Sequence, residues 1–170
     1  VIMECNDLET IAFSEGLTEI QYLNINRCPK LKKVTFPHTL EKLGSPLFEE
    51  CPSLEGFYGN DKFHTADNRC LIAHQEPPLR PSTWHGLWLV KFAGGGLTEY
   101  TIPDGVRKIG RGAFNKRTEL KSIVMPDSVT EIGQAAFYGC SSLETITLSS
   151  SLNTIGSAIF MLCDNLKAFY

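Results

Sequence analysis

A period of 23 residues runs through this chain of 170 residues and constrains its fold more than any other feature. Cys5, Cys28 and Cys51 lie 23 residues apart, and Cys140 and Cys163 repeat the interval. The clearest unit, from 126 to 148, reads PDSVTEIGQAAFYGCSSLETITL, and the unit before it reads PDGVRKIGRGAFNKRTELKSIVM. Apolar residues that recur in this way indicate stacked coils, because no single coil could bury its apolar side alone.

Each unit ends in apolar residues that alternate with other residues, which is typical of a short strand. We expect seven such strands, paired in one parallel sheet with neighbours about 4.8 Å apart. The strands are expected to end near these residues: Phe13, Phe36, Tyr58, Ile102, Met125, Leu148 and Tyr170. The Ala-Phe-x-x-Cys stretch predicts a short helical or 3-10 turn on the outer side of the coil. The Ile-Gly pair predicts a tight bend in which glycine takes a positive φ.

Residues 60–102 break the period, because they hold 20 residues more than one unit needs. Two strand-like runs, 70–73 and 87–92, flank a proline-rich stretch, which favours a β-hairpin with a long irregular loop. Asp67-Asn68 suits a turn before the first of these strands. We therefore expect one domain over 1–170, with N-terminal repeats over 1–59, an irregular hairpin insert over 60–96 and C-terminal repeats over 97–170. A start at Val1, inside a repeat, suggests a fragment of a longer chain.

Repeats of about 20–29 residues with this leucine spacing are typical of leucine-rich repeats. The stretch from IPDGVRKIGRGAF through MPDSVTEIGQAAFYGCSSLETITL resembles the BspA-like leucine-rich repeat family of bacterial surface proteins, also found in some protists. The fold class we expect is α/β, mostly β: a right-handed leucine-rich repeat solenoid with one parallel sheet, short helical turns outside and a β-hairpin insert. The resemblance implies a secreted or surface-displayed protein that binds other molecules and performs no chemistry.

The composition is that of an ordinary globular domain, with 42% hydrophobic and 21% charged residues. A net charge of -3 gives no electrostatic footprint for nucleic acid. No apolar run approaches the roughly 18 residues that would insert into a membrane. We therefore expect neither nucleic acid nor a lipid bilayer as a partner.

Five of the six cysteines share one repeat position and should form a row inside the solenoid. They are interpreted as small buried hydrophobes, a common role for free cysteine. Disulfides between neighbouring coils are the alternative, although parallel Cβ vectors suit the disulfide dihedral poorly. The sequence leaves the redox state of the row open.

Other chemistry-bearing residues form no recognisable constellation. His64, Cys70, His74 and His85 fall in the insert, but they lack the short paired spacings of a zinc site. Gly94-Gly95-Gly96 lacks the Lys-Ser/Thr of a phosphate loop. Asp104 and Asp127 follow proline in equivalent turns, which indicates turn chemistry and not an acid/base pair. We expect no metal, no cofactor and no enzymatic activity.

The residues that alternate with the core along each strand should face outward on the concave side. The candidate ligand-binding residues are Lys33, Thr35, Tyr58, Glu99, Thr101, Ser122, Val124, Thr145, Thr147 and Tyr170. Trp84 and His85 in the insert loop are two further candidates, since exposed tryptophan favours a contact role. The alternative is that threonine and valine merely fill a solvent-facing sheet.

The function we favour is a non-enzymatic adhesion or protein-interaction module that is extracellular or displayed on a cell surface. Its partner would be a protein, such as one of the host extracellular matrix or serum, or a glycan. The alternatives are a carbohydrate-binding module, which needs an exposed aromatic platform, and a passive spacer beside a functional domain elsewhere in the chain. End coils without a polar cap would also favour self-association.

Overall fold

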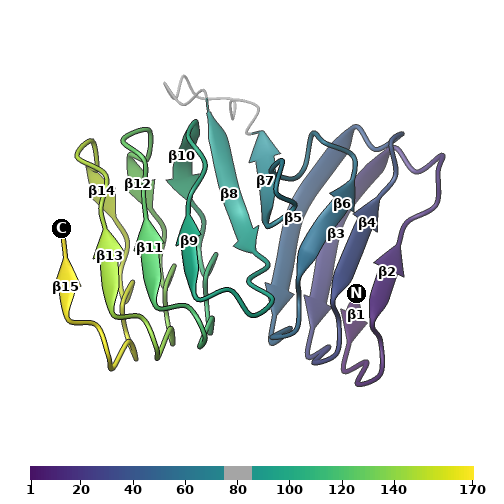
Figure 1. The fold of residues 1–170 in the computed structure, drawn as a ribbon. Coiled ribbons are helices and arrows are strands. Elements are labelled where there is room, and N and C mark those ends of the chain that lie inside the picture. The colour runs from purple at the N-terminus through teal and green to yellow at the C-terminus, as the bar shows by residue number, and fades with distance from the viewer. Residues whose placement is uncertain (75–85) are drawn as a thin grey trace. The chain divides into compact units, whose positions relative to one another are not determined.

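The computed structural model describes residues 1–74 and 86–170, which form fifteen strands and, within those ranges, no helix. The chain divides into two compact units, Val1–Leu71 with Phe92–Gly96 (unit 1) and Ile72–Lys91 with Leu97–Tyr170 (unit 2). In each unit, successive turns of the chain lay strand on strand in the manner of a parallel β-solenoid (Figure 1). We call the sheets made by the predicted strands front sheets and the sheets on the other side of the coil back sheets.

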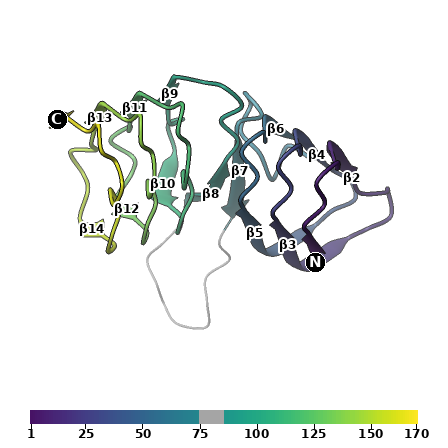
Figure 2. The same ribbon diagram turned by 90° about the horizontal axis from the view of Figure 1, so that it is seen from below.

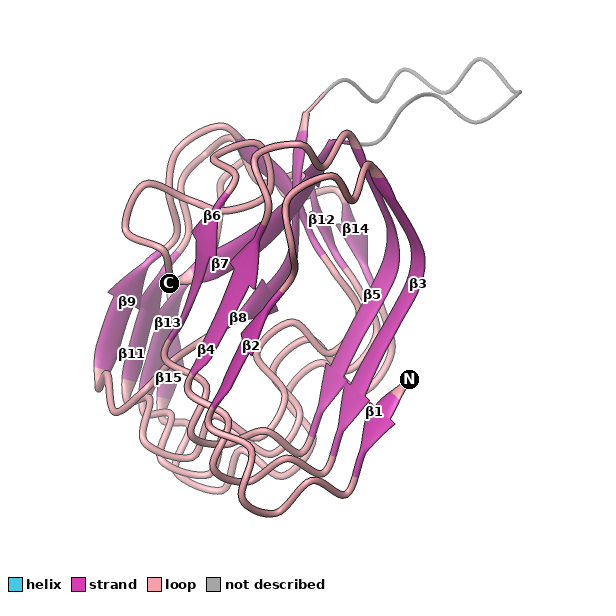
Figure 3. Ribbon diagram, turned by 90° about the vertical axis from the view of Figure 1, so that its right-hand side faces the viewer, coloured by secondary structure: helices cyan, strands magenta, loops and turns pink. Residues whose placement is uncertain are grey.

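Unit 1 contains one sheet of each kind, and the neighbouring strands of both sheets pair in parallel. The front sheet consists of β2 (Thr10–Ala12), β4 (Lys33–Phe36) and β6 (Gly56–Gly59), and the back sheet of β1 (Ile2–Met3), β3 (Glu19–Asn26) and β5 (Lys42–Glu49). Paired residues lie 23 positions apart, as in Ile11 beside Val34 and Ile25 beside Phe48. Figures 2 and 3 show β2 and β4 across the coil from β3 and β5. The core of unit 1 lies between these two sheets.

Unit 2 repeats this arrangement. Its front sheet consists of β9 (Glu99–Thr101), β11 (Ser122–Val124), β13 (Thr145–Thr147) and β15 (Ala168–Phe169). Its back sheet follows the order β14 (Thr154–Ile155), β12 (Glu131–Ile132), β10 (Val106–Ile109), β8 (Leu87–Phe92) and β7 (Cys70–His74). Ile123 lies beside Ile146 in the front sheet and Ile109 beside Ile132 in the back sheet. All four side chains are buried, so the 23-residue period is the period of the core.

The presence of two sheets corrects the expectation of a single sheet. The seven front strands lie where the alternation predicts them. The Val/Leu-x-x-Ile stretch that ends in the isoleucine of the Ile-Gly pair is also extended, and it pairs from coil to coil. These back strands are as short as two residues in β12 and β14. A two-residue strand is too short for its period to be seen in the sequence.

The expected helical turns are absent from the described residues, and the hydrogen bonds explain why. The amide of Phe114 donates to the carbonyl of Ala136, and the amide of Phe137 to that of Ile159, at 2.8 and 3.0 Å. These amides therefore bond to the next coil and not to a carbonyl four residues earlier, as a helix requires. In unit 1 the strands β3 and β5 continue through the same repeat positions.

The glycine of the Ile-Gly pair is needed for a different reason from the one expected. Gly133 and Gly156 do not have a positive φ. A Cβ at Gly133 would lie 2.8 Å from the backbone nitrogen of Arg111, and one at Gly156 would lie 2.5 Å from that of Gln134. Real Cβ atoms do not approach backbone so closely, so the coils can stack at this distance only because glycine has no side chain.

Both strand-like runs of the insert are strands, β7 and β8, and they are hydrogen-bonded neighbours. The turn expected before β7 is also present, with Asn68 at φ 61° and its amide bonded to the Thr65 carbonyl. The strand β8 pairs in parallel with β10, Leu89 beside Ile109. The second strand of the insert therefore takes the place of a back strand in the stack.

Candidate binding surfaces

The front sheet of unit 1 presents two rows of outward-facing side chains. Thr10, Lys33 and Gly56 are paired in one row, and Ala12, Thr35 and Tyr58 in the other. The residues between them on each strand are Ile11, Val34 and Phe57, all buried. The predicted candidates Lys33, Thr35 and Tyr58 thus lie together on one face.

Tyr58 lies flat on that face because its neighbours give it room. A Cβ at Gly56 would come within 2.8 Å of the Tyr58 hydroxyl, so the ring occupies the space that a side chain at position 56 would need. The Nζ of Lys33 lies 4.5 Å from the ring centroid, a cation–π contact worth about 0.5–1 kcal/mol at an exposed site. The result is a level surface with one cation over one aromatic ring.

The front sheet of unit 2 presents outward-facing side chains that are almost uncharged. Its first row contains Glu99, Ser122, Thr145 and Ala168, and its second row contains Thr101, Val124 and Thr147. Val124 is 39% exposed although it is apolar. Tyr170 follows β15 and is 78% exposed, with its amide bonded to the Ile146 carbonyl at 3.1 Å. The predicted candidates of unit 2 therefore share one face, while Trp84 and His85 lie outside the described residues.

The back sheet of unit 1 carries a surface that the sequence analysis missed. Tyr22 is 79% exposed, and Leu47 and Met3 are exposed apolar residues on neighbouring strands. The sequence alternates here in a way that could have predicted this surface. Leu23 and Ile25 are buried, whereas Tyr22 and Asn24 between them are not. Asn24-Ile25 stands at the repeat position of the Ala-Phe pair of other units, where a turn was expected. Unit 1 thus has one tyrosine on the outer side of each of its sheets, with Tyr22 exposed and Tyr58 half-buried.

Trp88 and Lys108 form a contact on the back sheet of unit 2. The Nζ of Lys108 lies 5.2 Å from the Trp88 ring and 2.6 Å from the Glu131 carboxylate. A Cβ at Gly110 would lie 2.6 Å from the indole nitrogen of Trp88. Trp88 belongs to the strand-like run 87–92, and the structure places it on β8, half-buried under Lys108. Its ring anchors β8 to β10 and is not a free platform.

Of the four metal-ligand candidates in the insert, His64 and Cys70 have side chains that the structure describes. Both are core residues. His64 is buried, and its Nδ1 lies 3.0 Å from the Thr65 carbonyl oxygen. Cys70 is buried, and its amide donates to the Thr65 hydroxyl at 3.0 Å. Residues 1–74 and 86–170 contain no group of three or more His, Cys, Asp or Glu residues that could hold a metal ion.

All six cysteines are free thiols. Those of Cys140 and Cys163 donate to the carbonyls of Phe114 and Phe137, each at 3.1 Å. Contact with the Cys163 thiol, together with burial, raises the pKa of Cys140 far above its ordinary value. A buried thiol that does not ionise is a poor nucleophile, so Cys140 behaves as a core residue.

Comparison with known proteins identifies the repeat. The family model "BspA type Leucine rich repeat region" matches residues 2–75 and 90–170 in six copies. No curated protein matches the chain. In the part of the chain that the structure describes, no helix is long and apolar enough to cross a membrane.

Several solved structures have a similar fold. A leucine-rich repeat protein from Eubacterium ventriosum has a TM-score of 0.68 and 22% identity, over 96% of this chain and 42% of that one. A leucine-rich cell surface protein from Faecalibacterium prausnitzii has a TM-score of 0.52 and 21% identity, over 97% of this chain and 60% of that one. The pneumococcal vaccine antigen PcpA has a TM-score of 0.60 and 18% identity, over 96% of this chain and 50% of that one. The likeness is one of fold, and this chain spans less than two thirds of each of these proteins.

Proposed function

Because this chain belongs to the BspA-type leucine-rich repeat family, we propose that it is a non-enzymatic interaction module of a cell-surface protein, which binds a protein ligand through its front sheets. Two of the structural relatives support this location, since one is named a cell surface protein and another a vaccine antigen. Repeat proteins of this kind commonly bind partners along an extended sheet surface.

The proposal rests on the rows of outward-facing side chains that the paired strands of the front sheets hold in register. Lys33, Thr35 and Tyr58 in unit 1 lie on a level surface whose backbone is fixed by parallel pairing on both sides of β4. Thr101, Val124 and Thr147 in unit 2 are β-branched side chains in register on neighbouring strands. Branched side chains lose little entropy on binding, because few rotamers are open to them. Many weak contacts along such rows would add up to a stable complex.

The test uses two tyrosines on opposite sheets of unit 1. The full chain is immobilised, and binding of purified extracellular matrix and serum proteins, one at a time, is measured by surface plasmon resonance. Tyr58→Ala removes the front-sheet ring, and Tyr22→Ala is the matched control on the back sheet. We expect Tyr58→Ala to weaken binding of a positive protein at least tenfold with nearly unchanged Tm, and Tyr22→Ala to leave the binding unchanged. Equal binding by the Tyr58 variant would exclude the front sheet of unit 1.

A carbohydrate-binding module is the second candidate, and one observation favours it. The Tyr22 ring is 79% exposed on a strand, and Asn24 is the next outward-facing residue on the same strand. A glycan array would separate the two functions: a sugar bound by the wild type and by Tyr58→Ala, but lost with Tyr22→Ala, would support the glycan. Absence of any ligand in both experiments would leave the passive spacer as the function.

A further inference from the structure

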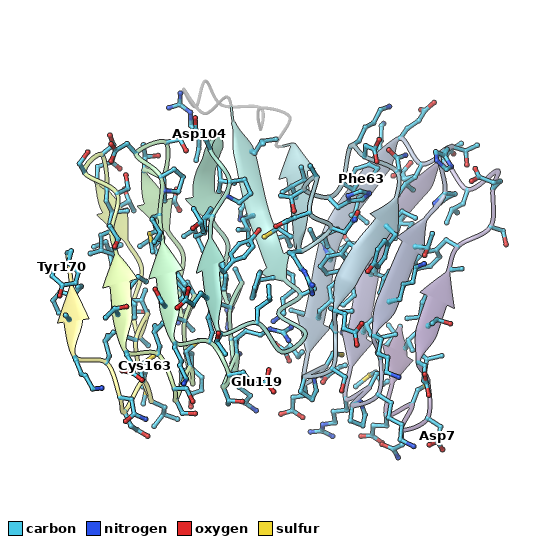
Figure 4. The ribbon with its side chains drawn as sticks, in the orientation of Figure 1. Asp7, Phe63, Asp104, Glu119, Cys163 and Tyr170 are labelled. Carbon is cyan, nitrogen blue, oxygen red and sulfur yellow. The ribbon has the colours of Figure 1, made fainter. Side chains whose placement is uncertain are left out.

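Asp104 and Gly105 form the turn that leads from β9 into β10 in unit 2, and both residues are exposed. Figure 4 labels Asp104 at this turn, on the outside of the stack. A Cβ at Gly105 would meet nothing nearer than a methyl group of Leu87 at 3.8 Å. Among the described residues, the space beside the Gly105 Cα is therefore open.

The carboxyl group of Asp104 lies against that nitrogen. The Gly105 amide donates to Oδ1 of Asp104 at 2.9 Å. Oδ1 is bonded to Cγ, the carboxyl carbon. Gly105 has a φ of 86°, in the left-handed region that favours glycine. The turn thus holds a nucleophilic nitrogen and an electrophilic carboxyl carbon together in the folded state.

We propose that Asp104 is a modification site, at which the folded protein forms isoaspartate by attack of the Gly105 nitrogen on the Asp104 side chain. The nitrogen bonds to Cγ of the protonated carboxyl group. The N–H proton and the carboxyl hydroxyl leave together as one water, and a five-membered succinimide remains. One water then adds to the main-chain carbonyl carbon, and its bond to the Gly105 nitrogen breaks. The net reaction is an isomerisation that consumes no oxidant, reductant or cofactor.

The next coil provides an internal control at the same repeat position. Asp127 is also exposed and also follows a proline, but Ser128 stands where Gly105 does. The Asp127 Oδ1 accepts bonds from the Ser150 amide at 3.0 Å and from the Ser150 hydroxyl at 2.7 Å. These bonds hold the carboxylate away from its own backbone. They also lower the pKa of Asp127, so that less of it is in the protonated form that the attack requires.

The modification would alter a turn on which β10 depends. Isoaspartate places one more atom in the main chain between Asp104 and Gly105. The turn is closed by the bond from the Val106 amide to the Pro103 carbonyl at 3.4 Å, and it is tied to the next coil by the bond from Gly105 N to Ser128 Oγ at 3.1 Å. We expect both amides to exchange faster with solvent in the modified protein.

The experiment follows the oxygen atoms. The folded chain is incubated near neutral pH in water enriched in ¹⁸O and then digested, and the peptides with Asp104 and Asp127 are compared by mass spectrometry and by isoaspartyl methyltransferase labelling. We expect one ¹⁸O and one methyl acceptor at Asp104, in several-fold excess over Asp127. Equal labelling of the two peptides would overturn the proposal.

Two further samples keep the result decisive. Asp104→Asn retains the geometry with a better leaving group, and we expect it to lose ammonia and accumulate isoaspartate faster than the wild type. A sample in urea tests the role of the fold. Isoaspartate that forms at Asp104 only in urea would overturn the proposal, because the claim is that the folded turn holds the reacting atoms together.

Discussion

The rings of Phe114 and Phe137 lie 5.0 Å apart between centroids and 25° from parallel, although 23 residues separate them. Phe160 continues the stack, 5.6 Å from Phe137. In unit 1, Phe13 and Phe36 stack in the same way at 5.8 Å. In unit 2 the phenylalanines of one repeat position therefore stack from coil to coil, and in unit 1 a similar stack lies at another repeat position, where the front strands end.

Phe137→Ala should cost about 3–5 kcal/mol of unfolding free energy, because Phe137 is fully buried and stacked on both sides. Urea denaturation followed by circular dichroism measures this. Phe169→Ala is the control, since that ring is 63% exposed, and it should cost less than about 1 kcal/mol. Equal losses for the two variants would mean that Phe137 is not a core residue.

Gly133→Ala should destabilise unit 2 by about 1–3 kcal/mol, because the new Cβ would overlap backbone atoms of Gly110 and Arg111. Gly112→Ala is the matched control. Although Gly112 has a positive φ, Ala135 and Ala158 occupy the equivalent positions of later coils with φ of 54° and 55°. This control should change the stability by about 1 kcal/mol or less. A Gly133 variant as stable as the control would refute close approach as the reason for the glycine.

Asn60→Ala should cost about 1–3 kcal/mol, the penalty for leaving buried carbonyls without a donor. The Asn60 side-chain nitrogen lies 3.1, 3.2 and 2.8 Å from the carbonyl oxygens of Pro37, His38 and Leu40. Asn60→Asp should cost more, because a carboxylate has the same shape but cannot donate and would repel these oxygens. Thermal unfolding of the two variants gives the order, and an aspartate variant as stable as the wild type would contradict this role.

Asp127 should titrate below its ordinary pKa of 3.8, because two Ser150 donors bond to the charged form. A pKa that is lower in the folded than in the unfolded state stabilises the fold above the unfolded pKa. That stabilisation is lost as the pH falls through the folded pKa. NMR titration of the side-chain carboxyl carbon measures the value, and Ser150→Ala should raise it. An unchanged pKa in that variant would show that the hydroxyl bond is not formed.

The front strands could be predicted because each has an apolar residue at a fixed place in the repeat, such as Ile123 and Ile146, both of which are buried with neighbours on both sides that are not buried. Their outward residues follow from the same alternation, so the exposed front faces were also predictable. Binding by these faces remains a prediction, since exposure alone does not identify a ligand.

The back sheets were not predictable in the same way. A strand such as Glu131–Ile132 is too short to show a period, and the residues that it pairs with lie 23 positions away in the sequence. The role of Gly133 depends on the distance between coils, which no local pattern contains. Tyr22 is the exception, because β3 has eight residues and alternates, although its second half stands at the repeat positions where a turn was expected.

The central claim is that the backbone of each coil bonds to the next coil where a helical turn was expected. Through-hydrogen-bond scalar couplings, measured by NMR on the isotope-labelled chain, test it directly. The account predicts a coupling between the Phe137 amide nitrogen and the carbonyl carbon of Ile159, since these groups are bonded at 3.0 Å. A coupling from Phe137 to the carbonyl of Gly133, the helical partner, would contradict it.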